Sequence, residues 1–365
     1  MPVLKVGGVE RLDASNLPAY ARGCAVLGSG GGGEVGTYLL QALQAVGDFG
    51  PVSVVRLEDL PDDSLVMPCG GIGAPTVSFE KFESGDEGRV LKEAVEELTG
   101  KPVAALMPGE IGGGNGLTPV AWAARAGLPI VDADGMGRAF PEMDQETFEL
   151  AGVSPSPAVL TDERGNVVVL RPVSGKWLER LARAVTVSFG GTSSGADHLM
   201  SAEEARRACV KGSISRALAI GEAIRDAEDP VEELVQVAGA VMLLAGKVMD
   251  VERKTTGAFA RGRAKIDGTG AHSGSALAID IQNENLVATE IPSGRVAASV
   301  PDLITIVDEQ TAEAIPTERL RYGQRVRVLG IPCDAMWRTP EGLQLAGPSA
   351  FGYDHEYVAV ELLHA

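Results

Sequence analysis

Short apolar runs alternate with segments of helical spacing through the first half of the chain. The runs that have the length of a buried strand cover residues 24–27, 52–55, 65–68, 103–107 and 128–131. Glycines follow these runs, and helical spacing then covers residues 37–46 and 117–127. Strands that alternate with helices favour a mostly parallel sheet covered on both faces. We therefore predict a Rossmann-like α/β domain with helices on both faces over residues 1–165.

The pattern changes in the second half. Ser201 and Glu204 have the spacing of a helix capping box. Two more helices are predicted over residues 213–226 and 230–249. Short apolar runs then cover residues 286–291, 296–300, 303–308, 325–331, 342–347 and 357–363. Such runs are typical of a β-rich module. Residues 164–166 predict a hairpin turn, so we place the boundary there and predict a C-terminal α+β, β-rich domain over residues 166–365.

The chain holds 46 glycines, and many of them follow the predicted strands. In open α/β sheets, ligands bind at the carboxyl ends of the strands. Glycine lets backbone N–H groups approach a ligand closely. We therefore expect a ligand-binding crevice, with backbone contacts from Gly30, Gly31, Gly32, Gly33, Gly112 and Gly113. Tight strand-to-helix packing without a ligand is the structural alternative.

Residues 28–33 also satisfy the GxGxxG spacing of dinucleotide-binding proteins. Arg56 stands near the position where an acidic residue would bind the ribose. An NADP-binding oxidoreductase therefore remains an alternative, but no nucleotide is favoured.

Reactive side chains accompany the glycines at the same predicted edge. Carboxylates that share a crevice can act as general acid and base, because burial separates their pKa values. They can also bind a divalent metal. A cysteine there can be a nucleophile if a positive neighbour lowers its pKa. The candidates are Cys69, Glu110, Asn115, Asp132 and Asp134. Turn formation and simple burial are the structural alternatives.

The second half adds further polar candidates. His198 follows Asp197 and is the histidine best suited to proton transfer. Two polar segments cover residues 250–257 and 282–285. A polar heterocycle needs both hydrogen-bond donors and acceptors. From these segments we expect substrate contacts by Asp250, Arg253, Thr255, Asn283 and Asn285.

Charge and cysteine content disfavour several kinds of partner and site. The net charge of −18 disfavours nucleic acid and anionic membranes as partners. The four cysteines form no CxxC pair, which disfavours a disulfide scaffold or a structural zinc site. The N-terminus lacks the apolar core of a signal peptide. We expect a cytoplasmic protein and, from base rates, a homo-oligomer.

Motifs spread along the whole chain resemble those of one family. They are GSGGGGEVG from Gly28, CGGIGAPTVSFEK from Cys69, PGEIGGGNG from Pro108, VDADGMGRAFPE from Val131, DVERKTTGAF from Asp250, QNENLVA from Gln282, PDLITIVD from Pro301 and RTPEGLQLAGPSAFGYD from Arg338. The chain resembles the S-methyl-thiohydantoin desulfurase-like family, whose members occur beside hydantoinases and oxoprolinases.

The resemblance implies two domains and hydrolysis of a five-membered cyclic ureide or its sulfur analogue. Water would attack the ring carbon that bears sulfur, and methanethiol would leave. The expected substrate is thus a small molecule. Asp132, Asp134 and Glu110 are candidates for acid, base or metal ligand, so a divalent metal remains a candidate cofactor. A non-catalytic subunit of a hydantoinase- or oxoprolinase-type assembly, with a hydantoinase-type protein as its partner, is the alternative.

Overall fold

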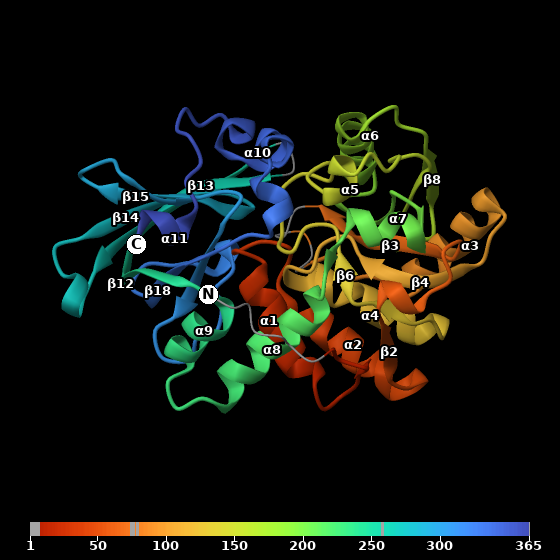
Figure 1. The fold of residues 1–365 in the computed structure, drawn as a ribbon, viewed down its shortest axis with the longest axis horizontal. Coiled ribbons are helices and arrows are strands. Elements are labelled where there is room, and N and C mark those ends of the chain that lie inside the picture. The colour runs from red at the N-terminus through yellow and green to blue at the C-terminus, as the bar shows by residue number, and fades with distance from the viewer. Residues whose placement is uncertain (1–7, 74–76, 78–79, 257–258, 365) are drawn as a thin grey trace.

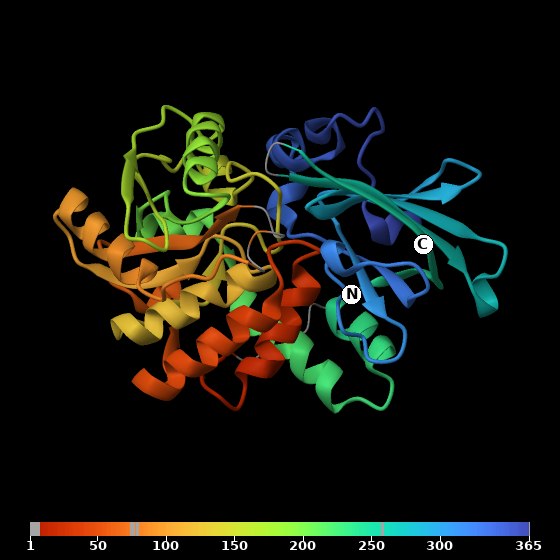
Figure 2. The same ribbon diagram turned by 180° about the vertical axis from the view of Figure 1, so that it is seen from behind.

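The computed structural model describes residues 8–73, 77, 80–256 and 259–364, except for the side chains of Thr255 and Thr256. It shows a mixed α/β protein built on two large sheets, which lie side by side in Figures 1 and 2. None of the helices in this described part is long and apolar enough to cross a membrane.

Parallel strands form the centre of the first sheet. These strands are β2 (Val52–Val55), β5 (Ile130–Val131), β4 (Val103–Pro108) and β3 (Leu65–Gly73). Antiparallel strands extend it on both sides, and the order is β1-β2-β5-β4-β3-β9-β7-β8. The added strands are β1 (Arg11–Leu12), β7 (Ala158–Thr161), β8 (Val167–Leu170), β9 (Thr192–Ala196) and β10 (Met200–Ser201), which pairs with β3. The sheet is therefore mixed, not mostly parallel as predicted.

Helices lie above and below the strands of the first sheet in Figure 1. They are α1 (Leu17–Leu27), α2 (Val35–Phe49), α3 (Glu87–Thr99), α4 (Thr118–Ala126), α5 (Thr147–Leu150), α6 (Gly175–Ser188), α7 (Ala202–Ala208) and α8 (Ser213–Asp226). The short strands β6 (Ala133–Asp134) and β11 (Val210–Lys211) pair beside them. The next helix, α9 (Pro230–Ala238), packs against α8 and the second sheet. The predicted capping box of Ser201 and Glu204 is confirmed at the start of α7.

One predicted strand is wrong. Residues 24–27 form the last turns of α1, so the glycine-rich segment that follows connects two helices. α1 packs very closely against α8 at Gly23. A Cβ added there would lie 1.7 Å from the carbonyl oxygen of Ala217, so a residue with a side chain would not fit. A short apolar run buried on all sides looks the same in a helix as in a strand, which explains the error.

The second sheet is antiparallel throughout and confirms the β-rich C-terminal region. Its order is β16-β15-β14-β13-β12-β18-β17. The strands are β12 (Val241–Thr256), β13 (Phe259–Gly268), β14 (Ala276–Gln282), β15 (Glu284–Ile291), β16 (Val296–Ser299), β17 (Leu303–Asp308) and β18 (Arg325–Ile331).

Three predicted elements of this region are wrong. The helix expected over residues 230–249 ends at Ala238, because Gly239 adopts a left-handed conformation, and β12 follows. The strands expected over residues 342–347 and 357–363 are largely replaced by the short helices α10 (Pro340–Ala346) and α11 (Val360–Leu363). Thr339 caps α10 by accepting a hydrogen bond from the backbone of Gly342.

The two sheets are joined by buried contacts. The ring Nε1 of Trp337 donates to the carbonyl oxygen of Met136 at 2.7 Å, and Trp337 is fully buried. Buried Arg138 donates to the carbonyl oxygens of Pro301 and Asp302. The predicted boundary at residue 166 falls inside the hairpin of β7 and β8, and β9 beyond it still belongs to the first sheet. The division between the sheets therefore lies further along the chain, between α9 and β12.

Candidate functional site

A cavity of about 150 Å³ lies at the carboxyl ends of β3 and β4. The second sheet reaches it through the turn between β14 and β15, which supplies Asn283 and Glu284. Of the residues predicted from the sequence, the lining includes Gly32, Gly33, Cys69, Glu110, Asn115 and Asn283. Eight further acidic residues of the lining were not predicted, and Glu146, Asp197 and Glu284 are the three considered below.

Glu110 is held in the cavity by neutral hydrogen-bond donors. The side-chain amide of Asn115 donates to its Oε1 at 2.6 Å, and the backbone of Phe140 donates to its Oε2 at 3.3 Å. Asn115 is itself fixed to both backbone groups of Gly71 in β3. Burial raises the pKa of Glu110 to about 7, although both hydrogen bonds lower it. Near neutral pH this carboxyl group can therefore exchange a proton in either direction.

Glu284 approaches the same cavity from the second sheet. The backbone N–H of Gly32 donates to its Oε1 at 3.2 Å. Its Oε2 has no hydrogen-bond partner in the described part of the chain. Burial, and then the charge of Glu110, raise its pKa well above the ordinary value. This raised pKa favours the protonated form and makes Glu284 a candidate proton donor.

The glycines of residues 28–33 have a structural reason to lack side chains. A Cβ added to Gly31 would lie 1.9 Å from the Oε1 atom of Glu284. A Cβ on Gly32 would lie 2.2 Å from the carbonyl oxygen of Gly112, and one on Gly113 would lie 2.5 Å from the backbone of Gly32. Gly30 packs in the same way against Asn285. These glycines thus bring two loops and Glu284 together, and Gly30, Gly31, Gly112 and Gly113 lie outside the cavity lining.

Asp132 and Asp134 also lie outside the cavity lining and bind backbone groups. Asp132 accepts from the backbone and the hydroxyl of Ser215, at the start of α8. Asp134 is fully buried, and its Oδ2 accepts from three backbone N–H groups, those of Ile111, Met136 and Gly137. Burial raises the pKa of Asp134 to about 7. We therefore assign both residues to the support of the loops and do not keep them as catalytic candidates.

Cys69 lines the cavity but lacks the environment of a nucleophile. Its thiol donates to the carbonyl oxygen of Met107 at 3.7 Å. Burial raises the pKa of this thiol well above its ordinary value, so the thiolate form is rare. Two of the candidates from the second half lie elsewhere. Arg253 donates to the carbonyl oxygens of Thr317 and Leu320, and Asp250 is exposed.

The amides of the polar segment at residues 282–285 have different partners. Asn283, with φ of 57°, lines the cavity while its Oδ1 accepts from the backbone of Ala260. Asn285 lies outside the lining and donates to the carbonyl oxygen of Ile304. Thr255 falls on β12, and its side chain lies outside the described residues.

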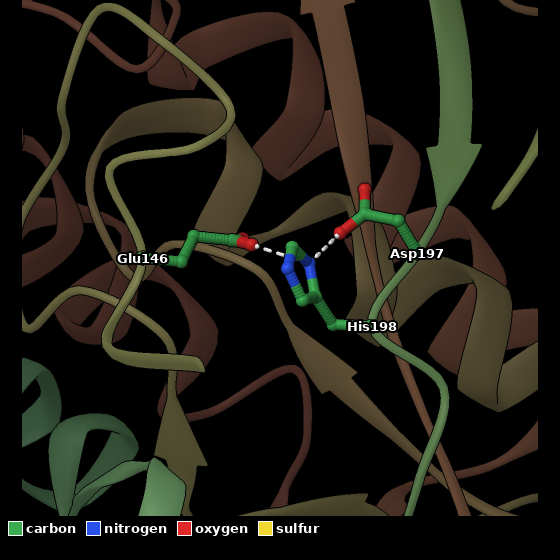
Figure 3. Close-up of side chains that lie close together, drawn as sticks. All are labelled: Glu146, Asp197 and His198. Atoms are coloured by element: carbon green, nitrogen blue, oxygen red, sulfur yellow. Dashed lines mark hydrogen bonds and ion pairs between the residues drawn. The ribbon is translucent and has the colours of Figure 1, made fainter. Parts of the chain in front are cut away.

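His198 is fully buried among three carboxylates at the margin of the cavity. Its Nδ1 lies 2.6 Å from Asp197 Oδ1 and 3.1 Å from Glu146 Oε2, and its Nε2 lies 2.9 Å from Glu149 Oε1. Figure 3 shows the ring between Glu146 and Asp197. Burial lowers the pKa of His198, but its hydrogen bonds to the carboxylates outweigh this effect and hold the pKa well above 6.5. Burial raises the pKa of Glu146 to about 8.

The site residues that were not predicted differ in how clearly the sequence points to them. Glu284 belongs to the polar segment at residues 282–285, and Asp197 precedes the predicted His198, so both stood beside named candidates. Glu146 carries no local signal, because it is the residue before the short helix α5 and reaches His198 only through the fold.

Comparison with family models supplies the identity of this architecture. A model described as S-Me-THD-like, N-terminal domain, matches residues 15–172, and one described as S-Me-THD-like, C-terminal domain, matches residues 173–360. The chain belongs to the S-Me-THD-like family. This finding confirms the resemblance to S-methyl-thiohydantoin desulfurase-like proteins.

A solved structure shares the fold of this S-Me-THD-like chain. It is the X-ray crystal structure of a structural-genomics target protein from Chromobacterium violaceum, which is 23% identical, with a TM-score of 0.78. The likeness covers 96% of this chain and 100% of that one. A search of curated proteins found no match.

Proposed function

We propose that this protein hydrolyses the C–S bond of an S-methyl-thiohydantoin or a closely related neutral five-membered ring. The observation that carries the proposal is the pair of buried carboxyl groups, Glu110 and Glu284, in the lining of one small cavity. Their environments raise both pKa values, to about 7 for Glu110 and well above the ordinary value for Glu284. Two carboxyl groups with separated pKa values supply a base and an acid at neutral pH.

In this mechanism Glu110 is the base and Glu284 is the acid. Ionised Glu110 takes a proton from water as the water oxygen bonds to the ring carbon that bears sulfur, while Glu284 protonates the adjacent ring nitrogen. The tetrahedral intermediate then returns its hydroxyl proton to Glu284 and forms a carbonyl group. The C–S bond breaks, and the departing thiolate takes the proton held by Glu110. The products are a hydantoin and methanethiol, and both carboxyl groups regain their starting state.

The size of the cavity supports a single ring as substrate. A protein cavity of roughly 150 Å³ accommodates one benzene molecule, and this cavity has a volume of about 150 Å³. Its charge supports a neutral ring. The acidic lining residues are Glu83, Glu87, Glu110, Glu142, Glu146, Asp162, Glu163, Asp197 and Glu284. The basic lining residues Lys81 and Arg183 are both ion-paired. Anionic ligands such as 5-oxoproline are therefore disfavoured.

The test is thiol release from S-methyl-thiohydantoin by the purified protein, followed with a thiol reagent. We expect catalytic turnover by the wild type and a loss of roughly 100-fold or more in Glu110→Gln. Glu142→Gln is the matched control, because Glu142 lines the same cavity without contacting Glu110 in the described structure. No release by the wild type, or equal release by Glu110→Gln, would refute the proposal.

A further inference from the structure

We propose that Glu146, Asp197 and His198 bind one divalent transition-metal ion at the margin of the cavity. The three side chains offer one atom each, and these atoms lie within 4.8 Å of one another. The proposal goes beyond the hydrolysis of thiohydantoins and does not depend on it. It rests on how the three side chains converge, as shown in Figure 3.

Two carboxylates face the same nitrogen of one ring. Asp197 Oδ1 and Glu146 Oε2 lie 2.6 and 3.1 Å from the Nδ1 atom of His198. A ring nitrogen carries at most one proton, so it cannot make a full hydrogen bond to both. Glu146 is only 5% exposed, and in the described part of the chain its Oε2 has no contact with hydrogen-bond geometry, although it lies 3.1 Å from Nδ1 of His198. A cation bound by Nδ1 and both oxygens would satisfy all three atoms.

The Nε2 atom of His198 has the partner that is typical of a metal-binding histidine. It lies 2.9 Å from Glu149 Oε1. A metal that displaces the proton of Nδ1 would leave the proton of Nε2 in place, donated to Glu149. Metal-binding histidines almost always donate their second N–H group to a carboxylate or a carbonyl group, which fixes the tautomer and the ring orientation. Glu149 is therefore a positioning residue in the proposed site.

The backbone brings two consecutive side chains to one point. In an extended strand, Asp197 and His198 would face opposite sides of the sheet. Here β9 ends at Ala196, and His198 adopts φ of 44°, which is uncommon for a residue other than glycine. Such local strain is found preferentially at functional sites.

The distances and donor types favour a transition metal. Zinc lies about 2.0–2.2 Å from nitrogen and carboxylate ligands, which places tetrahedral ligand atoms about 3.4 Å apart. The observed separations of 2.6 and 3.1 Å need to widen by less than about 1 Å. Three protein ligands leave a fourth position open, as in catalytic zinc sites. Because Glu146 and Asp197 line the cavity, that position would face it. Zinc is thus the first ion to test, and manganese the second.

The experiment measures metal binding by the full-length protein after removal of metals with a chelator. Calorimetry with zinc should show one equivalent bound, and cobalt should give the visible absorption of a low-symmetry site. We expect Glu146→Gln and Asp197→Asn to weaken the affinity for zinc by more than about 100-fold, and Glu149→Gln to weaken it by about 10–100-fold. Glu142→Gln, the same substitution in the same loop, should bind as the wild type does.

The alternative is a metal-free imidazolium held by three carboxylates. It is established if the wild type shows no saturable binding of zinc or manganese, or if Glu146→Gln binds as tightly as Glu142→Gln, and either result overturns the metal site. The thiol-release assay separates the two proposals. Metal binding without thiol release refutes only the proposed reaction, and thiol release by protein that binds no metal refutes only the metal site.

Discussion

Two groups of buried carboxyls border the same cavity, and they differ in their hydrogen-bond partners. Glu110 and Glu284 are hydrogen-bonded by an amide and by backbone N–H groups, all of them neutral. Glu146, Asp197 and Glu149 instead surround one histidine. The neutral donors and the charge of buried Arg138 only partly offset burial, so the pKa of Glu110 rises to about 7 and that of Glu284 rises well above its ordinary value. The second group surrounds a place for a positive charge. This difference supports the two proposals, proton transfer by the first group and cation binding by the second.

The largest expected effect comes from removing the proton donor of the first group. Glu284→Gln keeps the shape of the side chain but cannot supply a proton, so thiol release should fall about 100- to 10,000-fold. Glu142→Gln should retain nearly full activity. Steady-state rates at pH 7 and thermal unfolding of each variant provide the measurement. If the Glu284→Gln protein is active, Glu284 is not the proton donor and another group must serve as the acid.

The glycine-rich loop provides the next test, because it supplies the backbone N–H group that Glu284 accepts from. Gly31→Ala places a methyl group 1.9 Å from the Glu284 Oε1 atom and should cost about 1–3 kcal/mol of unfolding free energy. Gly47→Ala in α2 is the control, because a Cβ there meets no atom within 4 Å. That change should stabilise the protein by about 0.4–1 kcal/mol. Denaturant unfolding of both variants tests this, and equal stabilities would contradict the packing role of Gly31.

The same loop shows where sequence reasoning fails. The glycine pattern of residues 28–33 suggested a strand before it, yet a helix precedes it. The pattern also suggested ligand contacts, and Gly32 and Gly33 do line the cavity, but Glu284 packs against Gly31. Local pattern cannot identify a partner that is distant in sequence. The alternation of strands and helices, the capping box at Ser201 and most C-terminal strands were predictable because they depend on neighbouring residues. Glu146 was not, because only the fold brings it to His198.

The pH dependence of thiol release tests the role of Glu110 in the first group. The base, Glu110, must be ionised, and burial raises its pKa to about 7. The value of kcat/KM should therefore fall as the pH drops below about 7, by about tenfold per pH unit. A profile of thiol release between pH 5 and 9 measures this. An acid limb near the ordinary carboxyl pKa would exclude Glu110 as the base.

The smallest expected effect concerns the amide that positions Glu110. Asn115 donates to Glu110, which stabilises the ionised form and lowers its pKa. Removing this donor in Asn115→Ala should raise that pKa, so the acid limb of the rate profile moves to higher pH. The rate at pH 7 should then fall a few-fold, while the rate at pH 9 recovers. A merely structural role would lower the rate equally at all pH values. An unmoved limb would show that burial alone sets the proton affinity of Glu110, and that Asn115 serves only to hold the end of β3.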